Sequence, residues 1–343
     1  MKQSFAFQWH ITEQCDQRCR HCYVFAAAKT GASLGSVSAP AIPRIMDNCA
    51  DMCRALDREP YFYITGGDPL LHPSCWDILA ELQSRGIGFS ILGNPFHLTE
   101  DVCVRLKGLG CDRYQLSIDG LRDTHDAIRM DGSFDCTLEK IRRIRAAGIR
   151  CAVMTTVSRL NLHEIPEVID LVVERQVDIF AFGRYCPSTF DPETHVTPEE
   201  YRDLLERCWA RFNLHKDADT TFNLKDHLWT LFLYEKGLFA IPEGLDEELV
   251  YDGCHCGDCH LTILPDGTVH ACRRFASQVG NAVSEPLAAI FTGPRMEAYR
   301  DFGRFQKCSR CELLRFCRGC PAVAHGNTGN VYAADPQCWK AIA

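Results

Sequence analysis

Short apolar runs alternate with amphipathic segments over the first half of this sequence, and that alternation restricts the fold more than any other feature. The strand candidates are 5–11, 61–65, 87–92, 113–118, 149–156 and 177–182. The helix candidates between them are 40–57, 74–86, 99–109, 134–147 and 162–175. Because parallel strands need crossover connections of this length, the pattern predicts an α/β fold with a parallel sheet. Six units are too few for a closed eight-stranded barrel, but they suit an open barrel or a doubly wound sheet, and in both folds ligands bind at the C-terminal ends of the strands.

The character of the chain changes near residue 253. Two more helices are predicted before that point, over 197–213 and 221–236, and a hairpin is predicted after it, over 261–270. The segment from residue 253 onward has few apolar runs and nine cysteines, so we expect bound metal to stabilise its fold. We therefore expect three parts, namely a β/α domain over 1–215, a helical linker over 216–252 and a small cysteine-rich α+β domain over 253–343.

The chain contains 21 cysteines in 343 residues. It has no signal-peptide pattern and no apolar run of about 18 residues. We therefore expect a cytoplasmic protein, and since disulfides are disfavoured there, closely spaced cysteines are better interpreted as metal ligands. Lys and Arg total 37 against 45 Asp and Glu, a net charge of −8, which argues against nucleic acid or a membrane as a partner.

The first cysteine group follows the first predicted strand directly. Cys15, Cys19 and Cys22 have the spacing C-x3-C-x2-C. Three thiolates can hold a [4Fe–4S] cluster whose fourth iron stays open to another ligand, which suits chemistry better than plain electron transfer. The alternatives are a zinc site with His21 as a further ligand, or cysteines that only pack in the core.

This spacing, with Tyr23 next, resembles the signature of the radical S-adenosylmethionine (SAM) superfamily. The second strand ends in Gly66-Gly67-Asp68-Pro69, which is similar to the family's G-G-E-P element with Asp in place of Glu. Ser117 begins S-I-D-G, which is similar to the family's S-L-D-G element. The resemblance implies a partial (β/α)6 TIM-like barrel, with SAM held on the open iron and bound by Tyr23, Gly66, Gly67, Asp68, Pro69 and Ser117.

Polar residues also lie at the ends of three other predicted strands. These are Asn94, Thr156 and Arg184, and at that edge of the sheet they would face a bound nucleoside. A capping or loop hydrogen bond explains each of them equally well.

The C-terminal cysteines resemble a SPASM domain, although the central group has two residues, not three, between its third and fourth cysteines. The resemblance implies two auxiliary [4Fe–4S] clusters, which with the first makes three. The ligands of auxiliary cluster I would be Cys254, Cys259, Cys272 and Cys320, with Cys256 as the alternative to Cys259. Those of auxiliary cluster II would be Cys308, Cys311, Cys317 and Cys338. A zinc ribbon on Cys308, Cys311, Cys317 and Cys320 is the other interpretation, but it leaves the remaining cysteines without a purpose.

The resemblance implies a radical SAM/SPASM enzyme that reductively cleaves SAM and abstracts a hydrogen atom through a 5′-deoxyadenosyl radical. We expect a ribosomally synthesised peptide or protein substrate, oxidative formation of a cross-link or thioether, and an electron donor such as flavodoxin or ferredoxin. The alternatives are a maturase of a small molecule such as a tetrapyrrole, and a redox-neutral peptide epimerase with Cys186 as hydrogen donor. The non-enzyme alternative is an iron–sulfur electron carrier. Because the first cysteine group begins at residue 15, we expect no separate N-terminal peptide-recognition domain.

Overall fold

The computed structural model describes residues 2–28, 35–246 and 249–342, which form two compact units. The first unit comprises Met1–Ser117, Asp126–Ala152 and Cys256–Arg300. The second comprises Ile118–His125, Val153–His255 and Asp301–Ala343. Both units therefore include residues from the predicted cysteine-rich domain, and the domain boundaries expected from the sequence remain a prediction. Residues 247 and 248 of the predicted linker lie outside the described residues.

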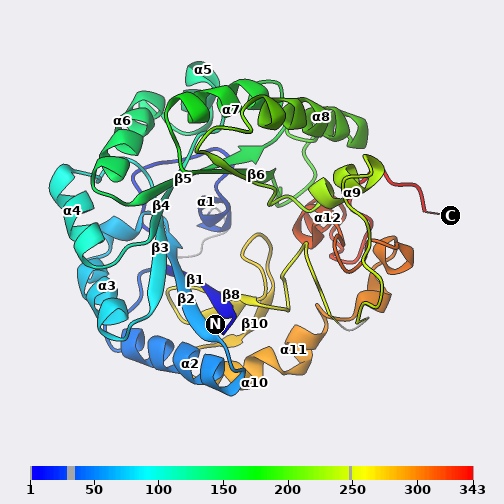
Figure 1. Cartoon of the computed structure of the whole chain (residues 1–343). Coiled ribbons are helices and arrows are strands. Elements are labelled where there is room, and N and C mark those ends of the chain that lie inside the picture. Colours follow the sequence, from blue (N-terminus) through cyan, green and yellow to red (C-terminus); the bar gives the residue numbers. More distant parts are fainter. Residues whose placement is uncertain (1, 29–34, 247–248, 343) are drawn as a thin grey trace. The chain divides into compact units, whose positions relative to one another are not determined.

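The first unit is built on a mostly parallel sheet (Figure 1). Its parallel strands are β1 (Ser4–Thr12), β2 (Glu59–Gly66), β3 (Gly88–Leu92) and β4 (Arg113–Ser117). All four match predicted strands to within two residues. One face of β1 presents Phe7, Trp9 and Ile11, none of which is exposed to solvent. These side chains belong to the apolar core of this unit, since successive residues of a strand point to opposite faces.

Three short strands from the C-terminal part extend the same sheet. They are β8 (His260–Ile263), β9 (Thr268–His270) and β10 (Gln278–Asn281), and the strand order is β10-β9-β8-β1-β2-β3-β4. β8 and β9 form the antiparallel hairpin expected from the sequence. The hairpin also pairs in parallel with β1, where Gln8 lies opposite Thr262. The sequence did not indicate that pairing, because it joins segments about 250 residues apart.

The first unit also contains helices. They are α1 (Tyr23–Ala28), η1 (Pro69–Leu71), α2 (Ala41–Ala55), α3 (Cys75–Ser84), α4 (Glu100–Gly108), α6 (Ser133–Ala146), α10 (Leu287–Phe291) and α11 (Pro294–Glu297). Figure 1 shows α2 beside α10. The Asn48 side chain of α2 joins them, since it donates to the carbonyl oxygen of Ala282 over 2.8 Å and accepts from the backbone N–H of Leu287 over 2.7 Å. The α2 face that carries Cys49 and Cys53 is buried, as expected for small core residues.

The second unit contains the last parallel strands and most of the later helices. β5 (Arg150–Val157) begins in the first unit, and β6 (Ile179–Arg184) pairs in parallel with β7 (Thr221–Asn223). The helices are α5 (Arg122–Ile128, which has residues in both units), α7 (Ile165–Glu174), α8 (Pro198–Leu214), α9 (Leu228–Glu235), η2 (Phe302–Arg304), η3 (Cys308–Arg310) and α12 (Pro321–Thr328). The helix predicted over 221–236 is wrong in its first part, because residues 221–223 extend along β6 and helix formation begins only at Leu228.

The helices in the described ranges are each too short or too polar to cross a membrane.

Candidate functional site

The three cysteines of the first group lie in one loop of the first unit, between β1 and α1. Cys15, Cys19 and Cys22 are each half-buried. Two donors point at their sulfur atoms: Nδ2 of Asn94 lies 3.6 Å from Sγ of Cys15, and Nη1 of Arg129 lies 3.6 Å from Sγ of Cys19. Such donors stabilise thiolate ligands and tune the metal that they hold. Burial raises the pKa of the Cys15 thiol to about 11, so metal binding there must release a proton. The donor set fits an iron–sulfur cluster.

Gly66 and Gly67 bring the end of β2 against the start of this loop. The backbone N–H of Gly67 donates to the carbonyl oxygen of Thr12 over 2.8 Å. A Cβ atom on Gly66 would lie 1.8 Å from the Thr12 oxygen, and one on Gly67 would lie 2.0 Å from the Gln14 oxygen. Gly66 also has a φ of 143°, which favours glycine. Only glycine fits either position, so this pair fixes where the cysteine loop begins.

Asp68 is a fully buried carboxylate beside that loop. Its Oδ1 accepts from the backbone N–H of Leu70 over 3.2 Å, while its Oδ2 has no hydrogen-bond partner among the described residues. Burial raises the pKa of Asp68 to about 7. A buried oxygen without a partner is costly, and a bound ligand that carries positive charge would remove that cost. Binding of the SAM ammonium group by Asp68 remains a prediction.

Sequence reasoning missed two residues next to Asp68. Nε2 of His97 lies 2.7 Å from Oδ2 of Asp16, and Oδ1 of Asp16 accepts from Nδ2 of Asn94 over 2.7 Å. The possible ligand atoms of Asp16, Asp68 and His97 lie within 4.8 Å of one another. The one signal in the sequence was position, since Asp16 directly follows the first cysteine and His97 lies three residues after Asn94. The pair orients Asn94 toward Cys15.

Tyr23, Pro69 and Ser117 complete the predicted SAM-binding residues of the first unit. The hydroxyl of Tyr23 accepts from Nε2 of Gln8 over 3.5 Å, and the guanidinium of Arg273 lies 5.1 Å from its ring centroid. Pro69 is buried as the first residue of η1, and Ser117 is half-buried at the end of β4. The structure thus places all three near the ends of their elements, and their role toward SAM remains a prediction.

In the second unit, the polar residues at the strand ends bond other protein groups. The backbone N–H of Thr156 donates to Oδ1 of Asp119 over 2.8 Å. Arg184 is buried and donates to the carboxylates of Asp226 and Asp335. Cys186 follows β6, half-buried, with its sulfur 3.7 Å from the carbonyl oxygen of Arg184. The Thr156 contact is a loop hydrogen bond, whereas Arg184 forms a buried ion pair with two carboxylates. Roles for Thr156, Arg184 and Cys186 toward a nucleoside or substrate remain predictions.

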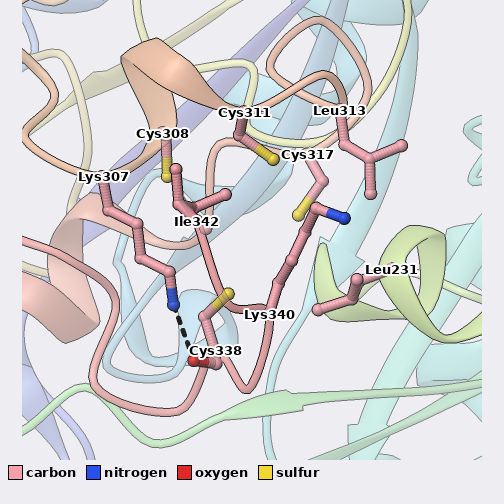
Figure 2. Close-up of a pocket in the computed structure, with 10 residues that line it drawn as sticks. Leu231, Lys307, Cys308, Cys311, Leu313, Cys317, Cys338, Lys340 and Ile342 are labelled. Atoms are coloured by element: carbon pink, nitrogen blue, oxygen red, sulfur yellow. Dashed lines mark hydrogen bonds between the residues drawn. The ribbon is translucent and has the colours of Figure 1, made fainter.

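Four cysteines of the second unit surround one cavity. Figure 2 shows the sulfur atoms of Cys308, Cys311, Cys317 and Cys338 turned toward the space that they enclose. Leu231, Leu313 and Ile342 complete an apolar lining, and two lysines also border the cavity, Lys307 and Lys340. Burial raises the pKa of Cys308 to about 12. Four convergent buried thiols in an apolar cavity fit a four-thiolate cluster, and they match the predicted ligand set of auxiliary cluster II.

The predicted ligands of auxiliary cluster I fall in both units. In the second unit, Cys254 accepts through its carbonyl oxygen from Nη2 of Arg318 over 2.5 Å, and Cys320 donates its backbone N–H to Asp335 over 2.8 Å. In the first unit, Cys259 lies next to β1, where its carbonyl oxygen accepts from Ala6 over 3.1 Å. Cys272 lies after β9, held by Ser277.

Cys256, the alternative to Cys259, forms a parallel bridge with His260 at the start of β8. It is buried, whereas Cys259 is half-buried. The choice between the two cysteines as a ligand remains a prediction.

Two protein families match this chain. Residues 9–172 match the radical SAM superfamily, and residues 254–321 match the SPASM iron–sulfur cluster-binding domain. The first match begins at β1 and contains the cysteine loop, Gly66, Gly67 and Asp68. The second contains eight of the nine C-terminal cysteines and ends before Cys338. The two matches agree with the two resemblances drawn from the motifs.

The chain is also similar to individual proteins over nearly its whole length. It is 26% identical to an AdoMet-dependent heme synthase of Nitratidesulfovibrio vulgaris, over 96% of this chain and 90% of that protein. It is 24% identical to the mycofactocin maturase MftC of Mycobacterium tuberculosis, over 96% of this chain and 81% of that protein. Among solved structures, SuiB of Streptococcus suis bound to its precursor peptide SuiA has a TM-score of 0.76 at 18% identity, over 99% of this chain and 77% of that one. This likeness confirms the expected fold class, a TIM-like partial barrel followed by a cysteine-rich domain.

Proposed function

Because this chain is an enzyme of the radical SAM family with a SPASM domain, we propose that it oxidises a peptide or protein substrate with the help of SAM and three [4Fe–4S] clusters. When bound, the first cluster and SAM supply a 5′-deoxyadenosyl radical that removes one hydrogen atom from the substrate. The substrate then loses a proton and one electron, so that two hydrogens leave in all. The observation that carries an oxidative outcome is the cavity of four convergent cysteines, Cys308, Cys311, Cys317 and Cys338.

That cavity supports electron transfer because its four thiolates are enough to ligate a cluster fully. A fully ligated cluster has no open iron for a substrate, so its remaining use is to accept or pass on an electron. Cys15, Cys19 and Cys22 provide only three thiolates and leave one iron for SAM. In this proposal Asp68 binds the ammonium group of SAM through its buried oxygen, and Asn94 and Arg129 donate to the sulfur ligands.

The charges near the first cysteine loop bear on whether the substrate is a peptide or a molecule with many carboxylates. Arg273 lies on the ring of Tyr23 and 3.5 Å from Oε1 of Glu13. Arg129 is directed at Cys19 and Gln17. Both cations are thus already held by protein groups, and the whole chain carries a net charge of −8. The loop itself also carries Arg18 and Arg20, so the charges around it are compatible with either kind of substrate.

The second candidate substrate is a tetrapyrrole. It is favoured by the likeness to an AdoMet-dependent heme synthase, which extends over 96% of this chain. The likeness to MftC has the same extent, and the fold is one that accommodates a precursor peptide in SuiB. Neither identity is high enough to fix a substrate.

Separate incubations with two probes test the proposal. Anaerobically reconstituted enzyme is incubated with SAM, dithionite and either a candidate peptide chosen from the reading frames that neighbour its gene or iron coproporphyrin III. The products are then analysed by mass spectrometry. We expect the peptide to lose two hydrogens per modification and the porphyrin to remain unchanged. A decarboxylated porphyrin with an unmodified peptide would replace the first candidate by the second.

A further inference from the structure

Arg184 ends β6 in a fully buried cluster of charges within the second unit. Its Nη1 lies 2.8 Å from both carboxylate oxygens of Asp335, and its Nε lies 2.9 Å from Oδ2 of Asp226. The side chains of Arg184 and Asp335 are 1% and 2% exposed. Such pairs are costly to bury, and they interact strongly because little water screens them. One guanidinium thus faces two carboxylates, and the cluster carries a net negative charge.

Asp335 links this ion pair to two predicted cluster ligands. Its Oδ2 accepts from the backbone N–H of Cys320 over 2.8 Å, and its carbonyl oxygen accepts from the N–H of Cys338 over 3.1 Å. Cys320 belongs to the predicted ligand set of auxiliary cluster I, and Cys338 to that of auxiliary cluster II. Asp335 therefore holds the backbone at a ligand of each cluster, at Cys320 through its carboxylate and at Cys338 through its own backbone carbonyl.

The backbone next to Cys320 approaches Asp335 closely. Gly319, which precedes Cys320, has a φ of 62°, and a Cβ atom there would lie 2.7 Å from the Cβ of Asp335. Gln337 supports the same loop, because its N–H donates to Oδ1 of Asp335 over 3.0 Å and its Oε1 accepts from Arg184 over 3.2 Å. Arg184 is thus tied to Asp335 directly and through Gln337, which fixes where its positive charge lies relative to Cys320 and Cys338.

We propose that the buried Arg184–Asp335 pair is a positioning and charge-tuning device that sets the reduction potentials of the auxiliary clusters. This inference rests on the proposed presence of those clusters. Reduction adds one negative charge to a cluster, so the nearby Asp335 carboxylate opposes reduction, while the Arg184 guanidinium offsets that effect. Arg184 acts on the clusters through Asp335 and the cysteine-bearing backbone, and no direct contact with them is needed.

The test compares two substitutions of opposite sign in the full-length holoenzyme. The auxiliary potentials are measured by electron paramagnetic resonance during a redox titration, with the first cluster recognised by its response to added SAM. Asp335→Asn keeps the shape of the side chain and removes a negative charge, so the auxiliary potentials should shift to more positive values. Arg184→Met removes a positive charge, so they should shift to more negative values, and Arg184→Lys should bring them back toward those of the wild type.

Asp226→Asn is the matched control. Asp226 bonds the same guanidinium and accepts from the backbone N–H of Leu228, but none of the hydrogen bonds described for it joins it to a cysteine. Its substitution should shift the potentials less than Asp335→Asn does. Equal shifts from both carboxylates would show that proximity to Cys320 and Cys338 is irrelevant, and the proposal would be overturned.

The remaining outcomes also decide the question. If Arg184→Met fails to retain iron, the sign of the Asp335→Asn shift still tests the tuning role. Unchanged potentials in Asp335→Asn, or shifts of the same sign in both variants, overturn the proposal. Loss of auxiliary iron in Asp335→Asn would show that the ion pair serves only in cluster assembly, and this result would also overturn the proposal. A wild-type enzyme with only about four iron atoms would instead refute the auxiliary clusters themselves, and with them this inference.

Discussion

The side-chain amide of Asn94 donates to the sulfur of Cys15 over 3.6 Å, while the same nitrogen lies 2.7 Å from Oδ1 of Asp16. Asn94 lies two residues after the end of β3, whereas Cys15 and Asp16 lie in the loop after β1. The contact therefore connects the cysteine loop to the sheet at a second strand. A hydrogen bond to a thiolate withdraws electron density from the metal that it holds, so this amide is placed to tune the first cluster.

Asn94→Ala should lower the reduction potential of the first cluster without removing its iron. The sulfur of Cys15 loses a donor, so the added electron is stabilised less. The measurement is a redox titration of the first cluster, together with the rate of 5′-deoxyadenosine formation, which should fall. Asn48→Ala is the control, because Asn48 only joins α2 to residues 282–287 and should leave the potential unchanged. An unaltered potential in Asn94→Ala would mean that the contact is only structural.

Asp68→Asn should stabilise the SAM-free protein at alkaline pH and weaken SAM binding. The pKa of Asp68 is raised by burial from an ordinary 3.8 to about 7. Between these values the folded protein holds a proton that the unfolded chain releases, so the free energy of unfolding falls as the pH rises through that range. The substitution removes a penalty on the order of 2–4 kcal/mol at pH 8. Loss of the carboxylate should cost about 1–3 kcal/mol of SAM affinity.

Thermal unfolding at pH 5 and pH 8 and a SAM titration by calorimetry test both halves of this prediction. Asp68→Glu, which restores the residue usual in the G-G-E-P element, is the control and should retain SAM binding. An unchanged SAM affinity in Asp68→Asn would show that the element acts through Gly66 and Gly67 alone.

The sequence predicted most of the regular elements because their signals are local. The periodic pattern placed β1 to β6 and α2, α3, α4, α6, α7 and α8 to within a few residues. Local patterns also located the hairpin of β8 and β9. The pairing of that hairpin with β1 could not be predicted, because strand partners are chosen by burial across the whole fold. The strand β7 was missed for the same reason, since its three residues extend only because β6 lies beside them.

Prediction of the candidate site from the sequence was limited in the same way. Cys15, Cys19, Cys22, Gly66, Gly67 and Asp68 were identified because their spacing is a motif. The geometry of the glycines was not foreseen, since Gly67 is required by the Gln14 oxygen, 53 positions earlier. Arg184 was expected either to face a nucleoside or to form a capping or loop hydrogen bond, and its ion pairs were not foreseen, because Asp226 and Asp335 lie 42 and 151 residues away in sequence. Long-range pairing of this kind leaves no local pattern to detect.

Replacing Cys15, Cys19 and Cys22 together with Ala should abolish SAM cleavage and leave about eight of about twelve iron atoms per chain. The auxiliary ligands are other residues, so their clusters should remain. Iron, sulfide and zinc analyses of anaerobically purified protein measure the loss. Cys49→Ala is the matched control, since Cys49 is buried in the core face of α2 and should leave the iron content unchanged. Zinc with only about four iron atoms in the wild type would contradict the two auxiliary clusters.

Gly67→Ala should displace the cysteine loop and destabilise the protein by about 1–3 kcal/mol. The added Cβ atom would lie 2.0 Å from the Gln14 oxygen, so the backbone of one segment must move. Thermal unfolding and iron content should both decrease. Gly108→Ala is the control, because a Cβ atom at the end of α4 meets nothing within 4 Å and should stabilise the helix by about 0.5–1 kcal/mol. Equal stability of the two variants would show that the close approach to the Gln14 oxygen does not explain why residue 67 is a glycine.

The fate of the abstracted hydrogen distinguishes oxidation from epimerisation. In an oxidative reaction the substrate loses two hydrogens and an auxiliary cluster accepts the electron. In a redox-neutral epimerisation, a thiol must return a hydrogen atom to the substrate radical. Cys186 is the candidate donor, because it is half-buried and lies two residues after the end of β6. Cys256 is the other candidate if Cys259 is the cluster ligand.

We expect a loss of two hydrogens, no deuterium at carbon after turnover in deuterated water, and nearly unchanged product formation in Cys186→Ala. The physical reason is that a cluster held by the four convergent thiols of the second unit would accept one electron, so no thiol would be required to return hydrogen. Mass spectrometry of the product measures both quantities. Cys208→Ala, a buried substitution in α8, controls for the loss of any cysteine in the same unit. A product of unchanged mass in ordinary water, with one deuterium at carbon in deuterated water that disappears in Cys186→Ala or Cys256→Ala, would establish the epimerase instead.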